Sequence, residues 1–182
     1  MMNKKLATVC IILTLAGCTA STATASKLVP PTINKPAEVV KQVSVKAGLI
    51  KSTKINKNTV QMKKVIKYLK TRVGKTSYVF SGSSPRGWDC SGLVRWTYER
   101  FGIELPHSAN KQGHVGKRVS TPKPGDIVVF AYNGSTNFYH SGIYIGNGKI
   151  INAHYGADST IIQPLTDYSS NQIRFVRVIE TK

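Results

Sequence analysis

The chain has 182 residues, of which 41% are hydrophobic, so it can build one ordinary domain and is not disordered throughout. Its formal net charge of +18 is concentrated near the beginning: residues 27–75 carry thirteen Lys and Arg against one acid, whereas residues 76–182 carry eleven against seven. The chain has three cysteines, at positions 10, 18 and 90, and Cys10 lies in a segment that cleavage of an export signal would remove. This number is too small for a framework of several disulfides.

The first residues have the pattern of an export signal. Lys4 and Lys5 precede the apolar stretch LATVCIILTLAG, which is too short to span a bilayer comfortably. Its end, LAGC, resembles the lipobox of bacterial lipoproteins, in which the cysteine is lipidated. This resemblance implies a signal peptide over residues 1–17 and a lipid anchor at Cys18. The alternative is the motif ATA at 23–25, an ordinary cleavage site that would release a soluble protein.

Residues 18–58 mix small polar residues, prolines and lysines without a sustained period, so we expect an extended, basic spacer. It is either a solvated linker or a segment whose lysines hold an anionic polymer or lipid surface. Nucleic acid is the usual partner of such charge in the cytosol. The export signal argues against that partner here, and we expect none.

From Thr59 the apolar residues follow a helical spacing, with Asn58 or Thr59 as the start and Gly74 as the end. The segment DCSGLVRWTYERFG predicts a second helix capped by Asp89, which places Cys90 in its first turn. A short helix is expected in LPHSANKQG. Four later segments, DIVVFAY, HSGIYIG, KIINAHY and IRFVRVI, have the residues of strands. Residues 59–182 therefore predict an α+β domain with N-terminal helices packed on an antiparallel β-sheet of about five strands.

A lone cysteine in the first turn of a helix is a candidate nucleophile, because the helix dipole lowers the pKa of its thiol. An imidazole would complete the activation. His107 and His114 lie in loop-rich sequence and are expected to be surface or loop residues, whereas His140 and His154 lie in adjacent strands.

The turn GNG between those two strands can close in two ways. A two-residue loop would pair Ile143 with Asn152 and separate His140 from the polar residues of the second strand. A three-residue loop would place His140, Asn152 and His154 on one face, and the polar character of that face favours this second register.

The motifs YVFSG, GWDCSGLV, FGIELPHSA, PKPGDIVVF and HSGIYIGNGKIINA together resemble the NlpC-type cysteine peptidases, papain-like bacterial cell-wall hydrolases. The resemblance runs from about Tyr78 to Val178. It implies that Cys90 is the nucleophile and His140 the general base. The third, orienting position falls on Asn152, with His154 as its competitor.

The resemblance also implies oxyanion or substrate contacts at Tyr78 and Ser91. It further implies a lipid-anchored peptidoglycan endopeptidase of the cell envelope that cuts stem peptides or cross-links by acyl transfer. Such an enzyme needs no metal and no cofactor, and we expect a monomer. In a Gram-negative host, Thr19 after the lipidated cysteine implies an outer-membrane location facing the periplasm. The alternatives are a non-catalytic wall-binding surface lipoprotein and an amidase or acyltransferase of the same superfamily.

Overall fold

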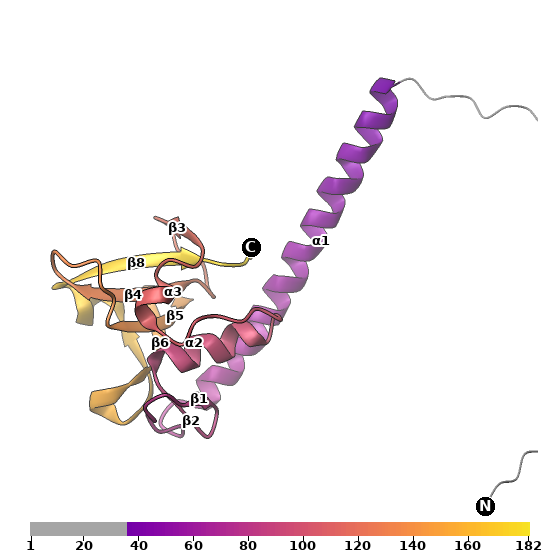
Figure 1. Ribbon diagram of the computed structural model, residues 1–182. Coiled ribbons are helices and arrows are strands. Elements are labelled where there is room, and N and C mark those ends of the chain that lie inside the picture. Colours follow the sequence, from indigo (N-terminus) through magenta and orange to yellow (C-terminus); the bar gives the residue numbers. More distant parts are fainter. Residues whose placement is uncertain (1–35) are drawn as a thin grey trace, which may run out of the picture.

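The computed structural model describes residues 36–182 as helices beside a curved antiparallel sheet (Figure 1). The helices are α1 (Pro36–Thr71), α2 (Cys90–Glu99) and α3 (Ala109–Gln112), with the 3-10 turns η1 (Tyr155–Ala157) and η2 (Leu165–Tyr168). The strands are β1 (Ser83–Ser84), β2 (Gly87–Trp88), β3 (Lys117–Val119), β4 (Ile127–Tyr132), β5 (His140–Gly146), β6 (Lys149–His154), β7 (Ser159–Pro164) and β8 (Asn171–Arg177). The expected α+β class is confirmed.

The main sheet has six strands in the order β3-β8-β4-β5-β6-β7, and all neighbours are antiparallel. The four expected strand segments became β4, β5, β6 and β8. The expected number of about five was low because the two edge strands, β3 and β7, were not recognised. An edge strand has a neighbour on one side only, and β3 consists of three residues, of which two are exposed.

Strand β4 is buried on both faces, and its alternating side chains enter two apolar clusters. Ile127, Val129 and Ala131 point to the face covered by α1 and α2. Val128 and Phe130 point to the other face, where Tyr168 of η2 packs against them. Because successive side chains of a strand point to opposite faces, β4 contributes to both apolar clusters.

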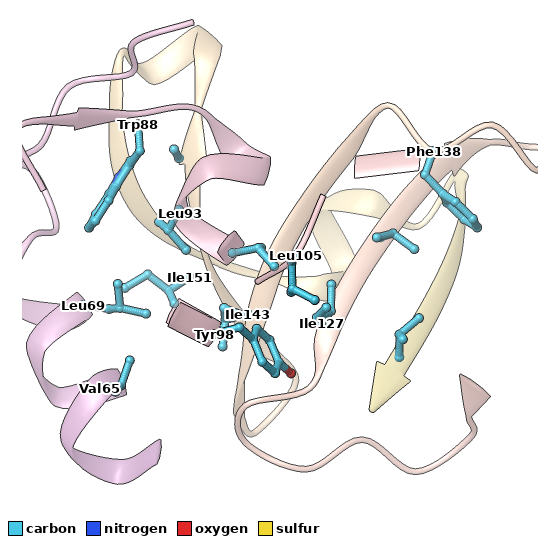
Figure 2. Packing of buried hydrophobic residues seen from close by; sticks show 14 of the residues in the cluster. Val65, Leu69, Trp88, Leu93, Tyr98, Leu105, Ile127, Phe138, Ile143 and Ile151 are labelled. Carbon is cyan, nitrogen blue, oxygen red and sulfur yellow. The ribbon is translucent and has the colours of Figure 1, made fainter. Parts of the chain in front are cut away.

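Figure 2 shows how helices α1 and α2 meet the sheet. Leu69 of α1 and Leu93 of α2 lie against Ile143 of β5 and Ile151 of β6, and all four side chains are fully buried. Burial of each such side chain stabilises the fold by about 1.5–3 kcal/mol. This packing fixes the start of α2 beside the first residues of β5.

Helix α1 begins at Pro36, so the expected extended conformation is wrong for residues 36–58. Proline is well tolerated in the first helical turn. The sustained burial of α1 begins only at Met62, and the preceding turns extend away from the sheet (Figure 1). Residues 46–54 are all exposed, which explains why this part of the sequence shows no apolar period. The proposed signal peptide, Cys18 and the first part of the spacer lie outside the described residues. Within residues 36–182, no helix combines the length and hydropathy of a membrane span.

The β5–β6 hairpin combines features of both expected turns. Asn147 and Gly148 form a two-residue loop with φ of 53° and 66°, and Gly146 pairs with Lys149. A bulge follows, so that Ile143 pairs with Ile151. Along the rest of the hairpin this is the register expected from the three-residue loop, and it directs His140, Asn152 and His154 to one face.

Candidate active site

The start of α2 is fixed by Asp89, which caps the helix as expected. Its Oδ1 accepts a hydrogen bond from the Gly92 N–H at 2.7 Å, and its Oδ2 accepts one from the Ser81 N–H at 3.0 Å. Cys90 is therefore the first helical residue. The same carboxylate thus holds both the helix and the loop that follows Tyr78.

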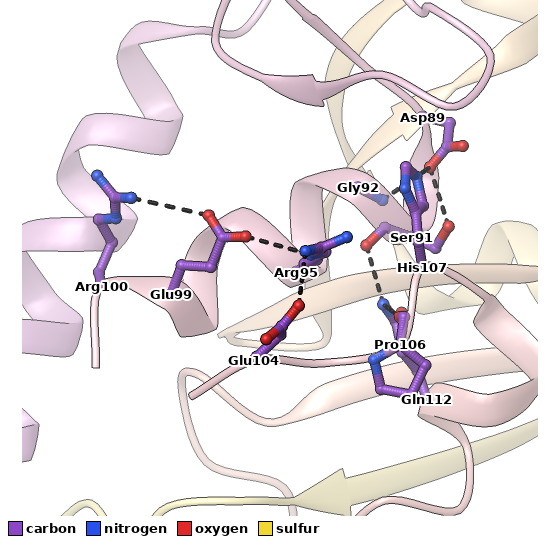
Figure 3. Close-up of polar contacts among 10 residues, drawn as sticks. All are labelled: Asp89, Ser91, Gly92, Arg95, Glu99, Arg100, Glu104, Pro106, His107 and Gln112. Atoms are coloured by element: carbon purple, nitrogen blue, oxygen red, sulfur yellow. Dashed lines mark hydrogen bonds and ion pairs between the residues drawn. The ribbon is translucent and has the colours of Figure 1, made fainter. Parts of the chain in front are cut away.

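Two further side chains converge on the Asp89 carboxylate (Figure 3). The Ser91 hydroxyl and the His107 Nε2 each lie 2.9 Å from Oδ1 and donate to it. Gln112 Nε2 donates to the Ser91 carbonyl oxygen at 2.9 Å. His107 lies in a loop, as expected, but its side chain is partly buried and supports the helix cap. The Ser91 hydroxyl is directed to Asp89, and Ser91 is not among the lining residues of the cavity described below. Its substrate contact stays a prediction.

The polar face of the β5–β6 hairpin holds the histidine and the asparagine together. His140 Nε2 lies 3.1 Å from Asn152 Oδ1, and the side chain of Asn152 is fully buried. Asn152 Nδ2 in turn donates to Gln163 Oε1 of β7 at 3.1 Å. The structure therefore brings together the two residues expected to form the base and its orienting partner.

The groups around Gln163 determine which nitrogen of His140 carries the proton. The Tyr168 hydroxyl donates to Gln163 Oε1 at 3.0 Å, and Gln163 Nε2 donates to Asp167 Oδ2 at 3.5 Å. Gln163 Oε1 is thus an acceptor, so Asn152 presents its amide nitrogen to Gln163 and its oxygen to His140. The His140 Nε2 must then donate its proton, which leaves Nδ1 free as a base.

His154 lies near this pair but makes a different bond. Its Nδ1 accepts from the Ala157 N–H at 3.1 Å and thereby caps η1. Its ring is nearly perpendicular to that of His140, with 6.2 Å between the ring centres. Of the two candidates for the third position, only Asn152 has a hydrogen bond to His140 in the described structure.

Cys90 and His140 line the same cavity, whose volume is about 330 Å³. Its lining residues are Tyr78, Cys90, Tyr139, His140, His154, Tyr155, Gly156 and Tyr168. The cysteine comes from α2 and the histidine from the first position of β5. Tyr78 packs edge-on against Tyr155, with 5.5 Å between ring centres. Within residues 36–182, no group of three or more His, Cys, Asp or Glu side chains is arranged to hold a metal ion.

Burial sets the protonation states in this cavity. It raises the pKa of the Cys90 thiol, a shift that the Ser141 N–H opposes and the Asp89 charge adds to. Burial also lowers the pKa of His140 to about 4, against the opposing effect of its bond to Asn152. The expected depression of the thiol pKa is therefore wrong, because desolvation of a thiol that is only 9% exposed is the largest effect. At neutral pH the site holds a neutral thiol and a neutral imidazole.

Tyr78 has the properties of a hydrogen-bond donor. Burial and the nearby Cys90 and Asp89 raise the pKa of its hydroxyl, so it keeps its proton at neutral pH. It lines the cavity together with Cys90. It could therefore donate to an anionic oxygen that forms beside the sulfur.

Sequence reasoning missed Gln163 and Tyr168, the residues that support Asn152. They lie on β7 and η2, which no sequence pattern predicted. The one available signal was the stretch STIIQP, which alternates only weakly between apolar and polar residues. Without the pairing of β6 with β7, nothing in the sequence connects Gln163 to Asn152.

Comparisons with known proteins agree with this fold. The model of the NlpC/P60 family matches residues 74–178. The chain belongs to the NlpC/P60 family. It is 41% identical over 104 residues to the gamma-DL-glutamyl hydrolase of Bacillus subtilis, a match that covers 55% of this chain and 25% of that protein. It is also 42% identical over 89 residues to a probable endopeptidase, an NlpC homolog of Haemophilus influenzae, covering 47% of this chain and 46% of that one.

A solved structure gives the same result for the fold. The NlpC/p60 domain of the peptidoglycan hydrolase SagA superimposes with a TM-score of 0.53 at 26% identity, covering 62% of this chain and 96% of that one. The chain thus spans less than half the length of the two curated relatives but nearly all of this isolated domain. The shared unit is the NlpC/P60 domain, and α1 lies before the matched residues 74–178.

Proposed function

We propose that the chain is a lipid-anchored peptidoglycan endopeptidase that hydrolyses peptide bonds in stem peptides or cross-links. The observation that carries this proposal is the cavity shared by Cys90 and the His140–Asn152 pair. Membership of the NlpC/P60 family supports hydrolysis of a peptide bond. The names of the relatives, an endopeptidase and a peptidoglycan hydrolase, support the substrate class.

The proposed reaction is acyl transfer through a thioester. His140 Nδ1 takes the proton of the Cys90 thiol while the sulfur attacks the peptide carbonyl carbon. The Cys90 backbone N–H and the Tyr78 hydroxyl stabilise the resulting oxyanion, each by about 3 kcal/mol. When the tetrahedral intermediate collapses, the C–N bond breaks and His140 returns the proton to the leaving amine.

Hydrolysis of the thioester then completes the cycle. Neutral His140 takes a proton from the attacking water, and the new C–O bond replaces the C–S bond. The same proton returns to the sulfur, so the products are a carboxylic acid and the free thiol. Asn152 keeps the ring in the required tautomer throughout.

Digestion of purified muropeptides, followed by mass spectrometry of the products, tests this function. We expect the unaltered chain to cut a peptide bond, and Cys90→Ser and His140→Ala to lose at least about 10²-fold in rate. His114→Ala is the matched control, because His114 is exposed and lies outside the cavity. Its rate should equal that of the unaltered chain.

Other results of the same digestion would indicate one of the alternative functions. Muropeptides that bind and stay intact would indicate a non-catalytic wall-binding protein. Cleavage between the glycan and the peptide would indicate an amidase, and transfer to an added amine would indicate an acyltransferase. Equal cleavage by the Cys90→Ser variant would contradict the proposal.

We also propose that Cys18 is lipidated and holds the protein at a membrane of the cell envelope. Support comes from the lipobox-like LAGC after an apolar stretch. In cell fractionation, the unaltered chain should sediment with membranes, whereas Cys18→Ala should be recovered in the soluble fraction. A mature N-terminus after residue 25 in the unaltered chain would exclude this anchor.

A further inference from the structure

One face of α1 points away from the rest of the domain and mixes lysines with apolar side chains. Each residue on this outer face lies three or four positions from another member of the face: Lys46, Leu49, Ile50, Thr53, Lys57, Val60, Lys64 and Lys67. Such spacing places them on one side of the helix. All eight are exposed.

The outer face lies opposite the buried face of the same helix. Met62, Val65, Ile66 and Leu69 pack into the domain and fall between the outer-face positions in the sequence. The outer face therefore remains free while the helix is docked. From Lys46 to Lys67 it is about 32 Å long at 1.5 Å per residue.

The apolar side chains of the outer face are unusually open to water. Leu49 is 66% exposed, Ile50 62% and Val60 55%. Each has lysines of the face within one helical turn. A surface that binds anions through lysines alone needs no exposed apolar side chains. A surface that only keeps the protein in solution is expected to lack large exposed apolar residues such as Leu49, Ile50 and Val60.

The lysines of the outer face have no anionic partners in the described part of the chain. The ion pairs among residues 46–182 involve arginine or histidine and no lysine. The sequence of α1 contains nine lysines and one acid, Glu38, and residues 1–35 contain no acid at all. Among residues 46–182, the charge of this face is therefore not compensated by an ion pair.

We propose that the outer face of α1 binds the surface of an anionic lipid bilayer, with the helix axis parallel to the membrane plane. Its lysines would contact lipid phosphates while their hydrocarbon stems cover the boundary region. Leu49, Ile50 and Val60 would enter the shallow apolar layer beneath the head groups. The proposal rests neither on catalysis nor on lipidation of Cys18.

Other occupants fit the outer face less well. A second copy of the chain would bring lysines against lysines, which repel. A soluble anionic polymer would match the charge but leave Leu49, Ile50 and Val60 in water. Only a surface with anionic groups above an apolar layer uses both kinds of side chain.

Vesicle co-sedimentation tests the proposal with the full chain carrying Cys18→Ser, which removes the acylated thiol. The vesicles contain either phosphatidylcholine alone or a mixture with phosphatidylglycerol. Lys57→Gln/Lys64→Gln should weaken partitioning to the anionic vesicles about 25-fold, at about fivefold for each lysine. Lys111→Gln/Lys149→Gln, two exposed lysines outside α1, should have a much smaller effect.

A second pair of variants separates a bilayer from a soluble polymer. Leu49→Gln/Ile50→Gln keeps good helix formers and should weaken binding to anionic vesicles at least about fivefold, with unchanged binding to soluble polyphosphate. Phe80→Gln, an 84% exposed residue outside α1, is the matched control and should change neither. Circular dichroism confirms that α1 stays helical.

Three results would overturn the proposal. The lysine variants of α1 and of the control positions could lose vesicle binding equally. The chain with Cys18→Ser as its only change could bind neutral and anionic vesicles equally well. The Leu49→Gln/Ile50→Gln variant could bind anionic vesicles as the unaltered chain does while the lysine pair loses polyphosphate binding, which would identify a soluble polymer as the partner.

Discussion

Asn152 and His154 lie on the same strand and face, but their side chains make different bonds. Asn152 accepts from the His140 ring, whereas His154 accepts from a backbone N–H of η1. We therefore expect Asn152→Ala to lower kcat about 10²-fold with little change in KM, because the His140 tautomer is no longer fixed. His154→Ala should lower kcat less than about tenfold. Steady-state kinetics on one purified muropeptide decide between them, and the reverse order would assign the third position to His154.

Gln163 is a positioning residue that acts through Asn152. Gln163→Leu removes the acceptor for both the Asn152 amide and the Tyr168 hydroxyl, so the buried amide can turn over. We expect kcat to fall about tenfold at constant KM, and ring nitrogen NMR shifts should show a mixture of His140 tautomers. Gln163→Glu keeps an acceptor oxygen and should restore much of the rate. An unchanged tautomer in the leucine variant would show that Gln163 is not needed.

The sequence predicted the members of the site that belong to compact motifs. Cys90 stands in DCSGLV, and the spacing of twelve residues from His140 leads to Asn152. It did not predict the support of these residues. His107 reaches Asp89 from a loop, and Gln163 reaches Asn152 from an unrecognised strand. Such contacts depend on chain folding over long separations, which single-sequence patterns do not encode.

Among the elements, the start of α2 is restrained by several hydrogen bonds to one carboxylate, that of Asp89. Asp89→Ala would remove the acceptor for the Gly92 and Ser81 N–H groups and for the Ser91 hydroxyl. We expect the free energy of unfolding to fall by about 2 kcal/mol or more, measured by urea denaturation. Ser108→Ala is the control cap on α3, where the Lys111 N–H lies 3.4 Å from the serine hydroxyl. Its effect should be under about 1 kcal/mol, and equal effects would refute the special role of Asp89.

Elements with a buried face were predictable, and those without one were not. Strands β4, β5, β6 and β8 showed dense β-branched and aromatic residues because they lie within the sheet. Strands β3 and β7 lie at its edges, and residues 46–54 of α1 are exposed. The helix was therefore expected to start at residue 58 or 59 instead of Pro36. The bulge after the Asn147–Gly148 turn reconciles a two-residue loop with the register of a longer one.

At the scale of the whole molecule, folding stability should depend on the charge state of His140. Its pKa in the folded protein is about 4, below the ordinary value of 6.5, so the unfolded chain binds this proton more readily. The neutral His140 therefore contributes fully to the free energy of unfolding above pH 6.5. This contribution is lost as the pH falls from 6.5 to about 4, which lowers the free energy of unfolding by about 3 kcal/mol.

Urea denaturation between pH 7 and pH 4 measures this dependence. His140→Gln cannot take up the proton, so its free energy of unfolding should fall less over the same interval. His114→Gln, which changes an exposed histidine, should follow the unaltered chain. Identical pH dependence in all three proteins would show that His140 is not desolvated as the structure indicates.

The positive charge of the molecule is unevenly distributed. Residues 76–182, which hold the residues that line the cavity, carry eleven Lys and Arg against seven acids, whereas α1 carries nine lysines and one acid. Loss of lysines on the outer face of α1 should therefore leave hydrolysis of small soluble muropeptides unchanged. The proposed hydrolysis depends on the residues of the cavity and not on these lysines.

The most direct measurement of that account is the mass of the peptide containing Cys90 after acid quenching during turnover of a purified muropeptide. We predict an added acyl group on this peptide in the unaltered chain, bound as a thioester that hydroxylamine removes. In Asn152→Ala the same adduct should form more slowly. Product formation with no adduct at Cys90, and with the same rate in Cys90→Ala, would contradict nucleophilic catalysis by this cysteine.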